Sequence, residues 1–168
     1  MARTLTGTIK AGFGLHYKGD IDLGSQTARL PFPAEIVIGS GTGSGQSDLA
    51  FWDNRSLSAS ASEDLDLAAG LNDAFGQSLT FIEINGIYVK ADANNSGNIV
   101  VGGASANAFT GPFGAANDTV ALAAGESFII TNMGAGWAVT AGTGDLLKVA
   151  NSHASAAKYD IAIIGRSA

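Results

Sequence analysis

The chain has 168 residues, which is enough for one domain with a buried core, alone or with an extended arm. Only 14% of the residues are charged, and residues 31–168 hold thirteen acidic against five basic groups, which favours protein contacts and argues against a nucleic-acid partner. There is no cysteine, no signal-peptide-like start and no run of about 18 apolar residues, so disulfides, thiolate zinc sites, secretion by a signal peptide and a membrane partner are not expected.

The distribution of glycine predicts an all-β protein. Its 23 glycines flank short runs rich in Val, Ile, Phe, Tyr and Thr, and helical periodicity is nearly missing. Short strands at close intervals favour an antiparallel, jelly-roll-like β-sandwich over a parallel α/β sheet. The predicted strands are, in chain order, residues 5–9, 15–23, 35–38, 49–52, 55–61, 79–84, 87–91, 98–102, 119–122, 127–131, 137–140, 146–150 and 158–164.

The segment 39–45 (GSGTGSG) predicts a boundary between two parts of the chain. It is flexible by composition, so we expect a hinge between an extended N-terminal arm, residues 1–42, and a β-sandwich domain, residues 43–168. The first 30 residues hold four basic and two acidic groups, so this arm is mildly basic. A phosphate-binding loop is the alternative for the same glycines. It is disfavoured because Ser44 replaces the last glycine of G-x-G-x-x-G and no Gly-Lys-Ser/Thr follows.

Two β-hairpins are predicted between neighbouring strands. In residues 87–103, an alternating strand is followed by Asn94-Asn95-Ser96-Gly97 and a returning strand, which is typical of a tight turn. Residues 136–149 repeat this scheme around Gly142-Thr143-Gly144. Residues 62–75 are ambiguous: they begin like a helix, but Gly70 interrupts the helical face. A short strand followed by a loop or single turn is therefore preferred.

The loop beginning at Asp92 resembles the opening of a calcium-binding loop. Asp92, Asn94 and Ser96 supply oxygens at positions 1, 3 and 5, and Gly97 stands at position 6. The twelfth position is Gly103, so the bidentate glutamate is missing. A hairpin turn without metal is therefore favoured.

Few side chains form a pattern typical of catalysis. The acidic cluster Glu63, Asp64 and Asp66 offers paired carboxylates of the kind that glycoside hydrolysis needs, but a solvated strand face explains it as well. His16 and His153 lie far apart in sequence without a nucleophile motif, so surface or edge histidines are expected. No catalytic, cofactor-binding or metal-binding residue is predicted, and the chain is not expected to be an enzyme.

Aromatic residues suggest a binding role or a packing role. Trp52 and Trp137, with eight phenylalanines, are candidates for a platform on which sugars or bases stack. Burial in the sandwich core or in a subunit interface is the commoner fate of such residues, and it is the interpretation preferred here.

Several segments between residues 43 and 168 resemble small virion proteins encoded in tailed-phage structural modules. The segments are 43–49 (GSGQSDL) with 55–57 (RSL), 63–76 (EDLDLAAGLNDAFG), 87–90 (IYVK) with 95–103 (NSGNIVVGG), 136–147 (GWAVTAGTGDLL) and 159–165 (YDIAIIG). The resemblance implies a jelly-roll-like sandwich that decorates or cements a capsid, commonly as a trimer, or that serves as a head-spike or tail-associated component. It transfers no catalytic residue and no cofactor.

The resemblance and the composition together give a functional hypothesis. We expect a cement or decoration protein on the outer capsid surface of the virion, assembled in the host cytoplasm. Its expected partners are further copies of itself, as a homotrimer, and the major capsid protein, with neither nucleic acid nor membrane. The alternative is a head-spike or tail appendage that binds host-surface glycans through exposed aromatic residues. Edge strands with little charge are easily covered by a neighbouring subunit, which suits the first hypothesis.

Overall fold

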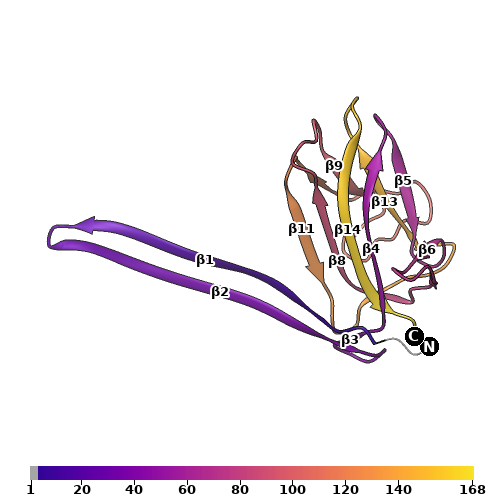
Figure 1. Ribbon diagram of the computed structural model, residues 1–168, viewed down its shortest axis with the longest axis horizontal. Helices are drawn as coiled ribbons and strands as arrows, with labels where there is room; N and C mark the ends of the chain where they lie inside the picture. The colour runs from indigo at the N-terminus through magenta and orange to yellow at the C-terminus, as the bar shows by residue number, and fades with distance from the viewer. Residues whose placement is uncertain (1–3) are drawn as a thin grey trace.

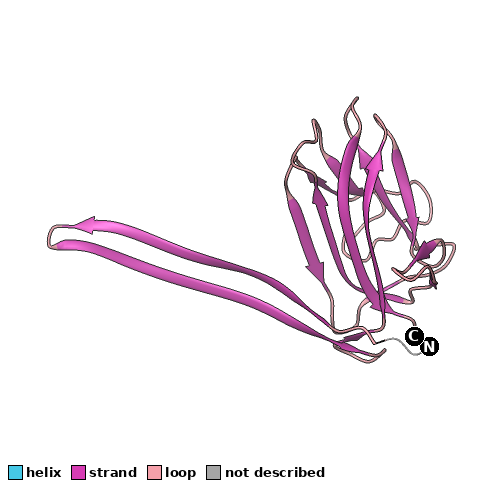
Figure 2. Cartoon of the chain, in the orientation of Figure 1, coloured by secondary structure: helices cyan, strands magenta, loops and turns pink. Residues whose placement is uncertain are grey.

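A computed structural model describes residues 4–168, apart from the side chain of Ile21. Every regular element in this range is a β-strand (Figure 2). No helix of the described residues is long and apolar enough to cross a membrane. A β-sandwich body carries a two-stranded arm that projects away from it (Figure 1). The strands are β1 Gly7–Ile21, β2 Gly24–Ser40, β3 Gln46–Ser47, β4 Leu49–Leu57, β5 Ser62–Asp66, β6 Leu71–Asn72, β7 Ser78–Leu79, β8 Glu83–Ala91, β9 Ile99–Gly102, β10 Thr119–Leu122, β11 Ser127–Thr131, β12 Trp137–Ala138, β13 Leu146–Asn151 and β14 Ala157–Arg166.

The body is built mainly from two antiparallel sheets, beside a separate two-stranded sheet of β6 and β7. The larger sheet has the order β11-β8-β14-β4, with β12 also paired to β8, and the smaller has the order β10-β9-β13-β5. Alternation along the strands supplies the core between them: Tyr159, Ile161 and Ile163 of β14 are buried, as are Leu147 and Val149 of β13. Branched and aromatic side chains at every second position bury one face of each sheet. The predicted all-β antiparallel sandwich is confirmed, and jelly-roll connectivity stays a prediction.

The arm is a long β-hairpin. Strands β1 and β2 pair from Gly7 with Ile38 to Ile21 with Gly24, and a two-residue turn joins them. At about 3.3 Å per residue, fifteen paired residues extend about 50 Å. The end of β2 pairs in parallel with β3, so the arm is joined to the body at its root. The predicted boundary at residue 42 falls in the loop between β2 and β3.

The two predicted hairpins in the body are wrong. Strand β8 lies in the larger sheet and β9 in the smaller, so the loop at residues 92–98 carries the chain from one sheet to the other. The second segment divides in the same way: β12 pairs with β8 and β13 with β9, leaving only a bridge between Thr140 and Gly144. Apolar and polar residues alternate along a strand in the same way whether the next strand in the chain pairs with it or lies in the other sheet. The pattern therefore does not identify the partner, which explains both errors.

Other strand predictions are confirmed or extended. Residues 62–75 contain the short strand β5 and a loop, as preferred over a helix, and the loop leads into the unpredicted two-residue strand β6. The predicted strands at 49–52 and 55–61 are largely the single strand β4, which ends at Leu57. Residues 24–34, which were not predicted to form a strand, belong to β2. Pro31 and Pro33 disfavour a strand in the sequence, yet an edge strand tolerates proline where the backbone nitrogen faces outward.

Candidate functional site

The arm carries the most distinctive surface of the described residues, which we call the apolar stripe. In an antiparallel pair, directly opposite residues lie on the same face, so the register assigns each side chain to one of two faces. One face holds only apolar residues and tyrosine from Ile9 to Tyr17 and from Ala28 to Ile36. The apolar stripe comprises Ile9, Ala11, Phe13, Leu15, Tyr17, Ala28, Leu30, Phe32, Ala34 and Ile36.

Most of the apolar stripe is open to solvent. Phe13 is 71% exposed, Tyr17 79% and Phe32 57%, and Leu15 and Leu30 are at least half exposed. Only the root is covered, where Ile9 and Ile36 are half-buried. A two-stranded hairpin is marginally stable in water unless something covers its apolar face. The stripe is therefore a surface suited to binding another apolar surface.

The opposite face of the arm is different in character. At its centre Gly12 lies opposite Pro33 and Gly14 opposite Pro31, while His16 lies opposite Arg29 nearer the tip. Towards the root, Lys10 Nζ lies 3.5 Å from Glu35 Oε1 in an exposed ion pair. This face is polar at both ends and nearly without side-chain bulk in the middle.

The apolar stripe was not among the surfaces predicted from the sequence. The signal that reveals it is period-two alternation in Ala11-x-Phe13-x-Leu15-x-Tyr17, repeated in residues 28–34 of the second strand. The two prolines hid this second strand, and without it the first has no partner. His16 lies on the polar face of the arm and is exposed, as expected of a surface histidine.

A second apolar surface lies on the outer face of the larger sheet. The register places Trp52, Ala162, Tyr88 and Ile129 in one row across four neighbouring strands, with Trp52 58% exposed. Near the arm root, Ile9 and Ile38 join this face around a small apolar pocket of about 90 Å³. Trp52 is thus an exposed aromatic residue of β4, whereas Trp137 packs against the core as the preferred interpretation expects.

Ionisable side chains meet where the edge strands β4 and β5 of the two sheets approach each other. Arg55 Nε donates a hydrogen bond to Glu63 Oε2 at 2.9 Å, and its Nη2 bonds to the same oxygen. Arg55 Nη1 donates to Asp53 Oδ2 at 2.9 Å, and the Tyr159 hydroxyl donates to Glu63 Oε1 at 2.9 Å. The group joins the two sheets across their open edge.

The electrostatics of this group favour a charged Glu63. Burial raises the pKa of the Glu63 carboxyl, but hydrogen bonds from Arg55 and Tyr159 outweigh it and hold that pKa below its usual value. The hydrogen bond to Glu63 raises the pKa of Arg55, while burial and then the same carboxylate raise the pKa of Tyr159. A general acid needs a raised carboxyl pKa, so Glu63 suits an ion pair better than proton donation.

The predicted pair Asp64 and Asp66 lies beside this group. Leu65 between them is buried, so the two aspartates share the outward side of β5. They line an open polar cleft of about 330 Å³ together with Arg55 and Glu63. Asp66 Oδ1 accepts hydrogen bonds from the backbone nitrogens of Ala68 and Ala69, at 3.0 and 2.8 Å, and so holds the turn after β5.

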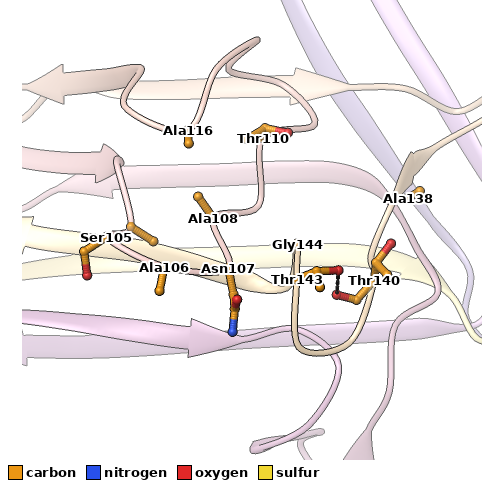
Figure 3. Close-up of a pocket in the computed structure, with 11 residues that line it drawn as sticks. Ser105, Ala106, Asn107, Ala108, Thr110, Ala116, Ala138, Thr140, Thr143 and Gly144 are labelled. Carbon is orange, nitrogen blue, oxygen red and sulfur yellow. Dashed lines mark hydrogen bonds between the residues drawn. The ribbon is translucent and has the colours of Figure 1, made fainter.

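A cavity of about 460 Å³ on the body has an uncharged lining (Figure 3). It lies between the loop at residues 104–110 and the turn at residues 138–144. Within that turn, Thr143 Oγ1 donates to the Thr140 carbonyl oxygen at 3.4 Å. The lining offers hydroxyls, one amide and many methyl groups. It is suited to contact with a neutral surface and holds no acid or base for proton transfer.

The loop that resembles a calcium site is held by its own hydrogen bonds. Asp92 Oδ1 accepts from the backbone nitrogen and the side-chain amide of Asn94, at 2.8 and 3.0 Å, which lowers the pKa of Asp92. Asn95 bonds twice to the backbone of Lys158, and Gly97 lies against His153. Within residues 4–168, no group of three or more His, Asp or Glu side chains is placed to hold a metal ion.

The glycine-rich loop at residues 39–45 is folded around Gln46. The backbone nitrogen of Gly43 donates to Gln46 Oε1 at 3.0 Å, and that of Gly45 donates to the Met133 carbonyl oxygen at 2.8 Å. Gly41 has a φ of 141° and lies against the Gln46 side chain, so a residue with a Cβ would be strained there. The predicted hinge is thus a short loop with several contacts to its neighbours.

Comparison with known proteins adds no relative. No family model, no curated protein sequence and no solved structure matched this chain.

Proposed function

We propose that this chain is a structural virion protein that decorates and stabilises a tailed-phage capsid. It acts on the outer capsid surface through contacts between its own copies, as a homotrimer, and with the major capsid protein. The observation that carries the proposal is the arm, which extends about 50 Å from the body with one face apolar and exposed. In a monomer this apolar surface stays in contact with water, which is unfavourable, whereas a neighbouring molecule in an assembly can cover it.

The body supports the same function. Its surface carries few charges, and both sheets end in open edge strands that a neighbouring subunit can cover at little desolvation cost. The Arg55–Glu63 ion pair links β4 and β5, the edge strands of the two sheets, and so holds this side of the sandwich together. Together these features favour assembly over turnover of a substrate.

Binding to purified capsids that lack the protein tests the proposal. The unmodified chain should occupy the capsids in many copies, and the chain lacking residues 1–40 should lose occupancy while its body stays folded, at a melting temperature lowered by the loss of the buried Ile38. The variant Lys18→Ser serves as the control, because it alters only the polar face of the arm. Unchanged occupancy without the arm, or no binding by the full chain, would contradict the proposal.

Exposure of Trp52 favours the second candidate function, a head-spike or tail-associated appendage that binds host-surface glycans. Trp52 and Tyr88 lie in one row on an exposed sheet face, an arrangement on which sugar rings can stack. Binding to a glycan array that disappears in Trp52→Ala and persists in Trp137→Ala would support this function. Stoichiometry separates the two functions, since decoration needs hundreds of copies per particle and an appendage only a few.

A further inference from the structure

The body covers only a small part of the apolar stripe of the arm. Only its root, at Ile9 and Ile36, is half-buried, and the remainder projects away from the sandwich (Figure 1). We propose that this stripe is covered by the same face of the arm in a second copy of the chain. The inference rests on the self-association in the proposed function and adds one surface through which copies meet. A face-to-face contact joins copies in pairs, so the trimer of the proposed function needs a further contact, on the body.

The composition of the stripe suits contact with itself. Its cross-strand pairs are Ile9 with Ile36, Ala11 with Ala34, Phe13 with Phe32 and Leu15 with Leu30, so the four pairs towards the root each join two identical residues. No charged side chain lies on this face between Ile9 and Tyr17. Two copies can therefore meet face to face without bringing like charges together, which is a requirement of any symmetric contact.

The exposed apolar area is a large part of what a stable interface needs. Aromatic side chains offer about 150–250 Å² each, so Phe13, Tyr17 and Phe32 at their observed exposure contribute on the order of 400 Å². Leu15 and Leu30 add to this. The largest apolar patch of a typical monomer is about 300–600 Å². A standard interface buries about 800 Å² per partner, so the three aromatic side chains alone supply about half of that area.

The prolines of β2 disfavour strand addition along the outer edge of that strand. Strand addition to a hairpin needs free backbone donors along the outer edge. Pro31 and Pro33 remove two of these donors from the middle of β2, and proline in a sheet is confined to positions whose nitrogen faces outward. The outer edge of β2 is thus protected, while the apolar stripe is left open.

The charge of the hairpin points to the same occupant. From Gly7 to Ser40 it holds three basic and three acidic residues, so the balance that makes residues 1–30 basic disappears over the whole hairpin. Two of these residues, Lys10 and Glu35, form an ion pair with each other within the arm. A neutral arm with an uncharged apolar face does not repel a second copy of itself, so self-contact is not opposed by net charge.

Cysteine cross-linking of the full chain tests the proposal directly, because the natural sequence contains no cysteine. Leu15→Cys places a thiol on the stripe, and His16→Cys places one on the opposite face of the same strand. Under mild oxidation and without capsids, Leu15→Cys should form covalent dimers, whereas His16→Cys should stay uncross-linked. Equal cross-linking of both variants, or none in either, would overturn the proposal.

The mass of the assembly in solution provides the second measurement. The unmodified chain should have a mass of at least twice 16.9 kDa by light scattering, and the mass of the double variant Phe13→Ser/Phe32→Ser should fall to about half of that value. The melting temperature of the body should not change, because these side chains are outside its core. An unmodified chain that stays monomeric at high concentration would refute arm pairing.

Two further outcomes separate this inference from its alternatives. If Leu15→Cys cross-links to Trp52→Cys in a mixture but not to itself, the occupant is the outer sheet face of another copy, and arm pairing is wrong. Capsid occupancy is measured independently. A chain that pairs through its arms and does not bind capsids upholds this inference and rejects the proposed function, whereas the reverse result rejects only this inference.

Discussion

Ser47 donates a hydrogen bond from its hydroxyl to Asn85 Oδ1 at 3.0 Å, and both residues are completely buried. Ser47 ends β3, which pairs with the root of the arm, and Asn85 lies in β8, at the middle of the larger sheet. Asn85 also donates to the Asn132 carbonyl oxygen at 3.1 Å. A buried polar contact of this kind fixes the root of the arm to the body.

Removing the Ser47 hydroxyl should destabilise the protein. Ser47→Ala leaves Asn85 Oδ1 without this donor inside the fold, which should lower the free energy of unfolding by about 1–3 kcal/mol. Urea unfolding measures the change. Ser56→Ala, at an exposed position of β4, is the matched control and should change the free energy of unfolding by less than about 0.5 kcal/mol. Equal effects of the two variants would show that the buried contact contributes nothing.

The ion pair across the sheet edges should make stability depend on acid. The pKa of Glu63 is lowered in the folded state from its ordinary value of 4.5, so folding favours the charged carboxylate. The resulting stability is present above 4.5 and is lost as the pH falls through the lower folded pKa. Glu63→Gln should therefore be less stable at pH 7, by about 1–3 kcal/mol, because it loses charged hydrogen bonds.

The same variant should also respond less to acid. Thermal unfolding followed from pH 7 to pH 3 should show a shallower loss of stability below pH 4.5 for Glu63→Gln than for the unmodified chain. Asp64→Asn is the control, since Asp64 is exposed on the neighbouring position of β5. If Asp64→Asn flattens the profile as much as Glu63→Gln does, the ion pair is not the source of the dependence.

Gly165 should be required at the irregularity between β14 and β8. The register shifts between Ile164 and Gly165, and a Cβ at Gly165 would lie 2.2 Å from the Glu83 carbonyl oxygen and 2.7 Å from Phe81 Cδ1. Gly165→Ala should therefore lower the free energy of unfolding by about 1–3 kcal/mol, as overpacking does. Gly19→Ala, which meets nothing within 4 Å, should leave it unchanged or slightly higher.

Alternation in the sequence predicts strands well and their partners poorly. The predicted strands at residues 127–131 and 146–150 coincide with β11 and β13 to within one residue. Strands β8 and β9 were also found, but a hairpin was expected between them and they lie in different sheets. Inward and outward positions of a strand are set by the core, whereas the partner is set by crossovers that leave no local pattern.

The candidate functional surfaces were predicted from the sequence only in part. Glu63 was identified only as one acid of a cluster, because its partners Arg55 and Tyr159 lie 8 and 96 residues away in sequence. The apolar stripe has a local pattern in each strand, but Pro31 and Pro33 interrupt the second. Proline indicates where a strand cannot be central, and in β2 it marks an edge strand of an isolated hairpin.

Those two prolines should also protect the arm from aggregation. Pro31→Val with Pro33→Val restores two backbone donors on the outer edge of β2 and raises strand propensity, so edges of different molecules can pair. We expect growing light scattering and thioflavin fluorescence on incubation at 37 °C, with the body still folded. Thr27→Val, on the same face of the same strand, adds an apolar branched side chain without a new donor and should stay clear. If solutions of the double variant stay clear, the prolines are not what prevents aggregation, and pairing of the apolar stripes would already shield the outer edges of β2.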